Sequence, residues 1–125
     1  MITIVLVDDQ PSVLEALQQY FALEPDLCIV GKAKDAAEAL DLVMRLQPDV
    51  VLLDFQMPGI DGIAAAAALR GAAPRTRVVI LTIHDNRSVR ARAHAAGVTS
   101  FVGKHDGAEV LLAVVRGSAP RCANY

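Results

Sequence analysis

The 125-residue sequence predicts a single α/β domain with a parallel sheet between two layers of helices. Short apolar runs rich in β-branched residues alternate five times with segments of helical period, a pattern typical of βα repeats. Several runs are apolar at consecutive positions, as in strands that are covered on both faces. Right-handed crossovers between such strands place helices on both sides of the sheet.

Five segments are predicted to be strands. They are Ile2–Val7, Leu27–Val30, Val50–Leu53, Val78–Leu81 and Ser100–Val102. Lys32 and Lys34 follow the second of these segments. Because charged residues discourage further pairing at the edge of a sheet, we expect this segment to be an edge strand.

The first two helices have clear amino-terminal signals. Pro11 suits the first turn of a helix. The apolar face of this helix consists of Val13, Leu14, Leu17, Tyr20 and Phe21. Asp35 is expected to cap the second helix, which ends before Pro48. Its apolar stripe consists of Ala36, Ala39, Leu40 and Val43.

The remaining helices are predicted from composition and from helix-ending residues. An alanine-rich third helix begins near Asp61, which is expected to cap it, and stops before Pro74. The fourth spans about Asn86–Ala96, with Gly97 as its carboxyl-terminal stop. The last spans about Asp106–Arg116. Residues 1–116 therefore form the predicted domain, and residues 117–125 a loose tail or a truncated linker.

Composition narrows the class of protein. Apolar residues make up 54% of the chain, yet no run is as long as a membrane span. Ile2–Val7 is too short for a signal peptide and precedes two acids, so we expect a cytoplasmic protein. The two cysteines, Cys28 and Cys122, are expected to be reduced thiols, the first in the core. A net charge of −2 gives no support for general nucleic-acid binding.

Polar side chains follow four of the predicted strands. Asp8 and Asp9 follow the first strand, Asp54 the third, Thr82 the fourth and Lys104 the fifth. Each has an ordinary explanation by itself: an aspartate can cap a helix, a threonine can be a strand residue and a lysine can be solvated. Together they lie beyond the carboxyl ends of parallel strands, where ligands bind in open α/β sheets.

Electrostatics indicates what such a site would hold. Three carboxylates about 4–5 Å apart repel each other by roughly 3–4 kcal/mol per pair at an effective dielectric constant near 20. Lys104 supplies one positive charge, which is insufficient, whereas Mg²⁺ suits carboxylate ligands. A carboxylate beside Mg²⁺ can attack phosphorus, so Asp54 is a candidate nucleophile. Thr82 could then donate a hydrogen bond to a phosphoryl oxygen.

Several motifs together resemble a known family. They are the pair Asp8-Asp9, the segment DFQMPGIDG from Asp54 to Gly62, Thr82, and FVGK from Phe101 to Lys104. The chain from Met1 to about Arg116 resembles the bacterial response-regulator receiver domains of two-component systems. This resemblance implies a flavodoxin-like (βα)5 three-layer sandwich with strand order 2-1-3-4-5. The family often has proline after the lysine, and His105 at that position resembles the NarL type, whose receivers precede a helix-turn-helix.

The resemblance also implies how the metal is held. Asp54 would be the phospho-acceptor. Asp9, Asp54 and the backbone carbonyl of Gln56 would bind Mg²⁺ directly, and Mn²⁺ could substitute for it. Asp8 would contribute, often through water.

Two further roles follow from the same resemblance. Lys104 would pair with the acceptor carboxylate and then with the phosphoryl group. Thr82 and Phe101 would be the switch pair, in which the hydroxyl moves toward the phosphoryl group and the ring turns inward. The face formed by the fourth helix, the fifth strand and the fifth helix would change shape as a result.

The implied partners are a sensor histidine kinase or a phosphotransfer protein. A homodimer would use the face that changes shape, DNA would be bound only through an output domain absent from this sequence, and no membrane is involved. The chain would catalyse only its own phosphorylation and dephosphorylation. The apolar residues of the fourth helix are mostly alanine, and Arg87, Arg90 and Arg92 are expected on a solvated face, so we expect this helix to be weakly docked.

Other functions compete with this one. A Mg²⁺-dependent phosphatase with an aspartyl nucleophile commonly has a cap, for which 125 residues leave no room. A nucleotide or flavin binder needs a phosphate loop after the first strand, where Asp8-Asp9 would repel the ligand. A receiver-like interaction module that is never phosphorylated is the most serious rival. A stand-alone relay is the alternative to the regulatory part of a longer transcription factor, which the end of the chain favours.

Overall fold

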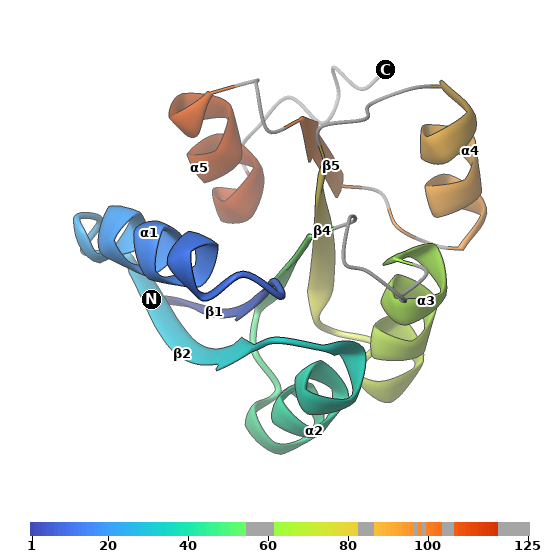
Figure 1. Cartoon of the computed structure of the whole chain (residues 1–125), viewed down its shortest axis with the longest axis horizontal. Helices are drawn as coiled ribbons and strands as arrows, with labels where there is room; N and C mark the ends of the chain where they lie inside the picture. The colour runs from blue at the N-terminus through green and yellow to red at the C-terminus, as the bar shows by residue number, and fades with distance from the viewer. Residues whose placement is uncertain (55–61, 83–86, 97, 99, 104–106, 118–125) are drawn as a thin grey trace.

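Five parallel strands form one sheet in the order β2-β1-β3-β4-β5 (Figure 1). The computed structural model describes residues 1–54, 62–82, 87–96, 98, 100–103 and 107–117. The strands are β1 (Ile2–Val7), β2 (Leu27–Ala33), β3 (Val50–Asp54), β4 (Arg77–Thr82) and β5 (Ser100–Gly103). The predicted flavodoxin-like fold and strand order are therefore confirmed.

A helix follows each strand. The helices are α1 (Pro11–Ala22), α2 (Ala36–Leu46), α3 (Gly62–Ala72), α4 (Arg87–Ala95) and α5 (Ala108–Arg116). Figure 1 shows α1 and α5 on one side of the sheet and α2, α3 and α4 on the other. Every crossover thus returns the chain to a parallel strand by way of a covering helix, as three-layer α/β folds require.

Burial on both faces of the sheet explains why the central strand β3 is apolar from Val50 to Leu53. In β3, Val50 and Leu52 pack into the core under α1 and α5, whereas Val51 and Leu53 pack into the core under α2, α3 and α4. All four residues are at most 2% exposed. Because successive strand residues point to opposite faces, a strand covered on both faces buries every side chain.

The helices begin where the sequence indicates. Pro11 is in the first turn of α1, and Leu14 and Phe21 are buried beneath it. Asp35 caps α2, because its Oδ1 accepts a hydrogen bond from the amide of Glu38 at 2.8 Å. The predicted cap Asp61 and the predicted stop Gly97 lie outside the described residues.

The two edges of the sheet are β2 and β5. The register between β1 and β2 shifts between Ile4 and Val5, which pair with Ile29 and Gly31, so Val30 is an extra residue in β2. Cys28 also lies on this edge strand and is half-buried, so its predicted place in the core is wrong. An edge strand has a neighbouring strand on one side only, so its side chains are less fully covered than those of a central strand.

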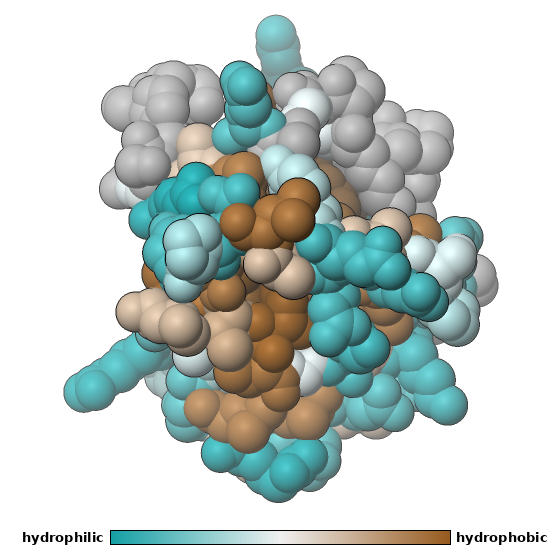
Figure 2. All heavy atoms as spheres, turned by 90° about the vertical axis from the view of Figure 1, so that its left-hand side faces the viewer, coloured by the Kyte–Doolittle hydropathy of each residue, from teal (hydrophilic) through white to brown (hydrophobic). Residues whose placement is uncertain are grey.

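The surface on the side of α1 is mixed. Figure 2 shows hydrophobic atoms gathered in a band between hydrophilic ones on this side of the molecule. An apolar cavity of about 220 Å³ opens between α1 and α5. Its lining consists of Leu17, Tyr20, Leu81, Val102, Gly103, Gly107 and Leu111. Within the described part of the chain, no helix has the length and apolar character needed to cross a membrane.

Candidate functional site

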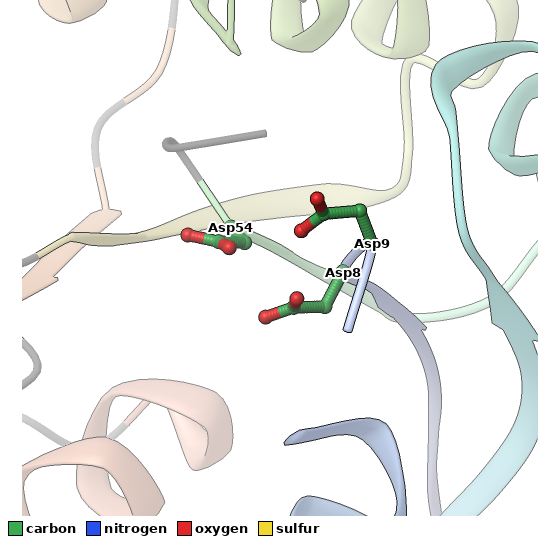
Figure 3. A group of neighbouring side chains, drawn as sticks. All are labelled: Asp8, Asp9 and Asp54. Carbon is green, nitrogen blue, oxygen red and sulfur yellow. The ribbon is translucent and has the colours of Figure 1, made fainter. Parts of the chain in front are cut away.

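Three aspartates meet at the carboxyl end of the sheet. Asp8 and Asp9 follow β1, and Asp54 is the last residue of β3. One carboxylate oxygen from each of the three lies within 4.8 Å of the other two. Figure 3 shows the side chains converging on the same space beyond the strand ends. The structure thus brings together the three acids that the sequence predicts as neighbours.

Strand register places these residues at one level. β1 and β3 are adjacent and parallel, and Val7 pairs with Leu53. The residue after each of these two is an aspartate, so Asp8 and Asp54 lie side by side at the carboxyl ends of β1 and β3. On the other flank of β3, Asp54 pairs with Leu81 of β4. The site therefore lies at the centre of the sheet, beyond the carboxyl ends of the adjacent strands β1 and β3.

The carboxylates are withdrawn from solvent. Asp8 is 2% exposed and Asp54 is 5% exposed. Oδ1 of Asp8 accepts a hydrogen bond from the amide of Gln10 at 2.9 Å. Gln10 is the cap residue of α1 and makes no side-chain capping bond. Neither Asp8 nor Asp9 therefore occupies the cap position, so helix capping does not explain this pair.

One buried oxygen tests whether the cluster suits a cation. Oδ1 of Asp9 is buried and has no hydrogen-bond partner among the described residues. Burying a carboxylate oxygen without a partner is costly, as is holding three carboxylates at about 5 Å, which repel by roughly 3 kcal/mol per pair at an effective dielectric constant near 20. Oxygen donors of this kind fit a small, hard divalent cation. The cluster is thus suited to bind one.

The other predicted site residues are placed only in part. Thr82 ends β4, and its backbone pairs in register with Gly103 of β5. Gln56 and Lys104 lie outside the described residues. In the sequence, Lys104 directly follows Gly103, the last residue of β5.

Phe101, the other member of the predicted switch pair, lies on β5. Its ring is half-buried and packs against the core under α2, α3 and α4. The guanidinium carbon of Arg90 on α4 lies 5.0 Å from the centroid of this ring. The prediction that Arg90 belongs to a merely solvated face is therefore incomplete. The sequence could not predict this contact, because periodicity describes the faces of one helix or strand and not its contacts with another.

A larger hollow of about 660 Å³ lies at the opposite, amino end of the sheet. It is lined by residues that include Asp49, Arg70, Arg75, Arg77 and Arg116. Arg77 donates hydrogen bonds to the carbonyl oxygens of Val114 and Val115, and Arg116 to Asp26 and Glu24. The hollow therefore owes much of its lining to side chains with structural roles, and the acid cluster is the better candidate site.

Comparison with known families decides the assignment. Residues 4–116 match the family model described as the response regulator receiver domain. The chain belongs to this family. The receiver domain so identified runs from Ile4 of β1 to the end of α5, and agrees with the motifs noted in the sequence.

Relatives narrow the type of receiver domain. The chain is 31% identical over 115 residues to the transcriptional regulatory protein DegU of Brevibacillus brevis, a match that covers 92% of this chain and 49% of DegU. It is 37% identical over 103 residues to a protein of Mycobacterium tuberculosis named as the transcriptional regulatory protein NarL, covering 82% of this chain and 48% of that protein. The predicted resemblance to NarL-type regulators is thus confirmed, and the receiver domain spans about half the length of these curated relatives.

A solved structure supports the same assignment. A two-component response regulator of the LuxR family from Aurantimonas sp. SI85-9A1 superposes with a TM-score of 0.84 at 30% identity. The match covers 99% of this chain and 94% of that chain. The receiver domain therefore shares its fold with this regulator of the LuxR family.

Proposed function

We propose that this receiver domain is a phosphorylation-activated switch of a two-component phosphorelay, with Asp54 as the phospho-acceptor. The observation that supports this most strongly is the convergence of Asp8, Asp9 and Asp54 within 4.8 Å at the carboxyl end of the sheet. Asp54 comes from the buried central strand β3, so its backbone is held firmly while its carboxylate faces the open edge.

The acceptor step is a phosphoryl transfer. An oxygen of the Asp54 carboxylate forms a bond to the phosphorus of the donor, and the bond between phosphorus and the donor's leaving group breaks. With acetyl phosphate the leaving group is acetate, and with a sensor histidine kinase or a phosphotransfer protein it is the imidazole of the phosphohistidine. Positioning and neutralisation of charge supply most of what such a transfer needs.

The residues present fit Mg²⁺. Asp9, Asp54 and the backbone carbonyl of Gln56 would hold it directly and Asp8 through water, with Mn²⁺ as a substitute. When bound, the cation neutralises charge on the transferred group's oxygens. Asp9 contributes a buried oxygen that has no hydrogen bond within the described structure, which suits a ligand. Asp8 also holds the amide of Gln10, and so orients the start of α1 beside the site.

The remaining site residues respond to the phosphoryl group. Lys104 pairs first with the acceptor carboxylate and then with a phosphoryl oxygen, and Thr82 donates a hydrogen bond to another. Phe101 turns inward as Thr82 moves, which changes the face formed by α4, β5 and α5. A phosphoryl group adds nearly two negative charges, which shift a conformational equilibrium rather than create a new state.

Output depends on the rest of the protein. The receiver domain forms residues 1–116, and residues 117–125 begin a linker to a helix-turn-helix domain that binds DNA in a cytoplasmic transcription regulator. Phosphorylation favours a homodimer through the face of α4, β5 and α5. The lengths of the relatives support this proposal. The matches cover about half of DegU and of NarL, which are named as transcriptional regulatory proteins, so each of them has a further segment of similar size.

Incubation with acetyl phosphate and Mg²⁺, followed by measurement of the intact mass, tests the central proposal. We expect a gain of one phosphoryl mass that Asp54→Asn and chelation each abolish. Asp41→Asn is a matched control, because Asp41 lies on the exposed face of α2 and pairs with Arg45. If the wild-type chain gains no mass from any donor, it is a receiver-like module that is not phosphorylated.

Lys104→Ala separates chemistry from folding. We expect this variant to retain its far-ultraviolet circular dichroism, because lysine side chains are rarely part of a hydrophobic core. It should lose much of the spectral change that phosphorylation produces in the wild type. Identical spectra for the phosphorylated and unphosphorylated wild type would contradict the proposed switch itself.

A further inference from the structure

The ring of Phe101 is contacted from outside its own strand. Its ring lies at the border of the core under α2, α3 and α4, and Arg90 of α4 places a guanidinium 5.0 Å from the ring centroid. A cation over an aromatic face at this distance is attracted by the quadrupole of the ring. The ring is therefore held from the solvent side as well as from the core.

The described part of helix α4 is mostly exposed. Its buried side chain there is Ala93, which is 1% exposed and buries little area. Arg87, Ser88, Arg90, Ala91, Arg92, His94 and Ala95 are all exposed. The contact between Arg90 and Phe101 is a direct contact between α4 and β5.

The ring is also close to the phosphorylation site in the register of the sheet. Phe101 pairs with Ile80 of β4, and two residues further along the same strands Thr82 pairs with Gly103. The chain reaches Lys104 directly after Gly103. Phe101 therefore lies one repeat of the pleat, or two residues, before the end of β5.

We propose that Arg90 is a positioning residue that keeps the ring of Phe101 in its half-buried place beside α4. By stabilising this resting position, the contact opposes the inward turn of the ring and so lowers the readiness of Asp54 to accept a phosphoryl group. The second part of this inference rests on the proposed function, and the first does not. An exposed cation–π contact changes an equilibrium by about two- to fivefold.

Ring-labelled phenylalanine makes the first part directly measurable. The chain has three phenylalanines, and the NMR signals of Phe101 are the ones that Phe101→Leu removes. We expect Arg90→Gln to shift these signals, and Arg90→Lys to shift them less because a cation remains. Arg87→Gln is the matched control, since Arg87 is an exposed arginine one turn earlier on the same helix. Equal effects of the Arg90→Gln and Arg87→Gln variants would overturn the inference.

Phosphorylation by acetyl phosphate in Mg²⁺ tests the second part. We expect Arg90→Gln to raise the rate by about two- to fivefold over the wild type, and Arg87→Gln to leave it unchanged. A shifted ring signal with an unchanged rate would overturn the link to phosphorylation. If the wild type takes no phosphoryl group, the proposed function fails, and the ring signals alone decide whether Arg90 positions Phe101.

Discussion

Nη1 of Arg77, at the start of β4, lies 2.9 Å from the carbonyl oxygen of Val114 near the end of α5. The same guanidinium also donates to the carbonyl oxygen of Val115. The last carbonyl groups of a helix have no partner within it, and a cation near them also favours the helix dipole. Arg77 therefore fastens the end of α5 to the amino end of the sheet.

Removing this guanidinium should destabilise the fold. We expect Arg77→Ala to lower the free energy of unfolding by about 1.5–3 kcal/mol, because two carbonyl oxygens lose a charged donor. Urea denaturation measures the effect. Arg75→Ala is the control, since Arg75 is an exposed neighbour in the turn before β4. A loss no larger than that of Arg75→Ala would show that water replaces the guanidinium without cost.

Two glycines should respond in opposite directions to the same substitution. Gly117 ends α5 with φ of +78°, and a Cβ there would lie 3.1 Å from Nη1 of Arg77. Gly117→Ala should therefore destabilise by about 1 kcal/mol or more. Gly71 is in α3, and a Cβ there would meet no described atom within 4 Å beyond its chain neighbours and the local helix backbone. Gly71→Ala should stabilise by about 0.5–1 kcal/mol in thermal unfolding. If both substitutions changed the stability in the same direction, the contrast between the two glycines would be wrong.

The acid cluster should make stability depend on divalent cations. In chelator, Asp9→Asn should raise the free energy of unfolding by about 1 kcal/mol, because it removes one charge from three crowded carboxylates. Excess Mg²⁺ should stabilise the wild type and stabilise the Asp9→Asn variant much less. Unfolding in urea with and without Mg²⁺ measures both. Asp41→Asn, on the exposed face of α2, should show neither effect.

The ion pairs of Arg116 should give a defined acid dependence. Nε of Arg116 lies 2.8 Å from Oδ2 of Asp26, and Nη2 lies 2.6 Å from Oε1 of Glu24. The hydrogen bond from Arg116 holds the pKa of Asp26 below its ordinary value of 3.8. A depressed pKa stabilises the fold above the unfolded pKa, and this contribution is lost as the pH falls through the folded pKa.

Comparing Arg116→Gln with the wild type isolates this contribution. The variant should be less stable near neutral pH, and the difference should shrink as the pH falls below about 4. Arg45→Gln is the control, because the pair of Arg45 with Asp41 is exposed on one helix and contributes little. A difference that persists undiminished in acid would mean that Arg116 acts by packing rather than by charge.

The sequence predicted the sheet well because its strands are buried on both faces. Ile2–Val7 was predicted with its exact bounds, whereas β2 extends three residues further than its apolar run. Lys32 and Ala33 belong to β2 because they pair with Leu6 and Val7, which a local pattern does not reveal. Strand ends are set by the neighbouring strand as much as by composition.

The acid cluster was equally predictable, since residues that follow adjacent parallel strands must meet at one edge. The contacts of Arg77 and Arg90 were not. Arg77 reaches a helix end 37 residues later in the chain. Arg90 meets Phe101 only because α4 is rotated so that this arginine faces β5. Both depend on how elements pack, which residue type and spacing leave undetermined.

The bulge at Val30 has a consequence for how copies of this chain associate. An incoming strand would need a run of evenly spaced amide and carbonyl groups on β2, and the inserted residue interrupts that spacing just before the lysine at position 32. The opposite border, β5, is four residues long. In the described structure neither border offers a long, regular template for cross-β growth, so the folded chain should resist fibril formation.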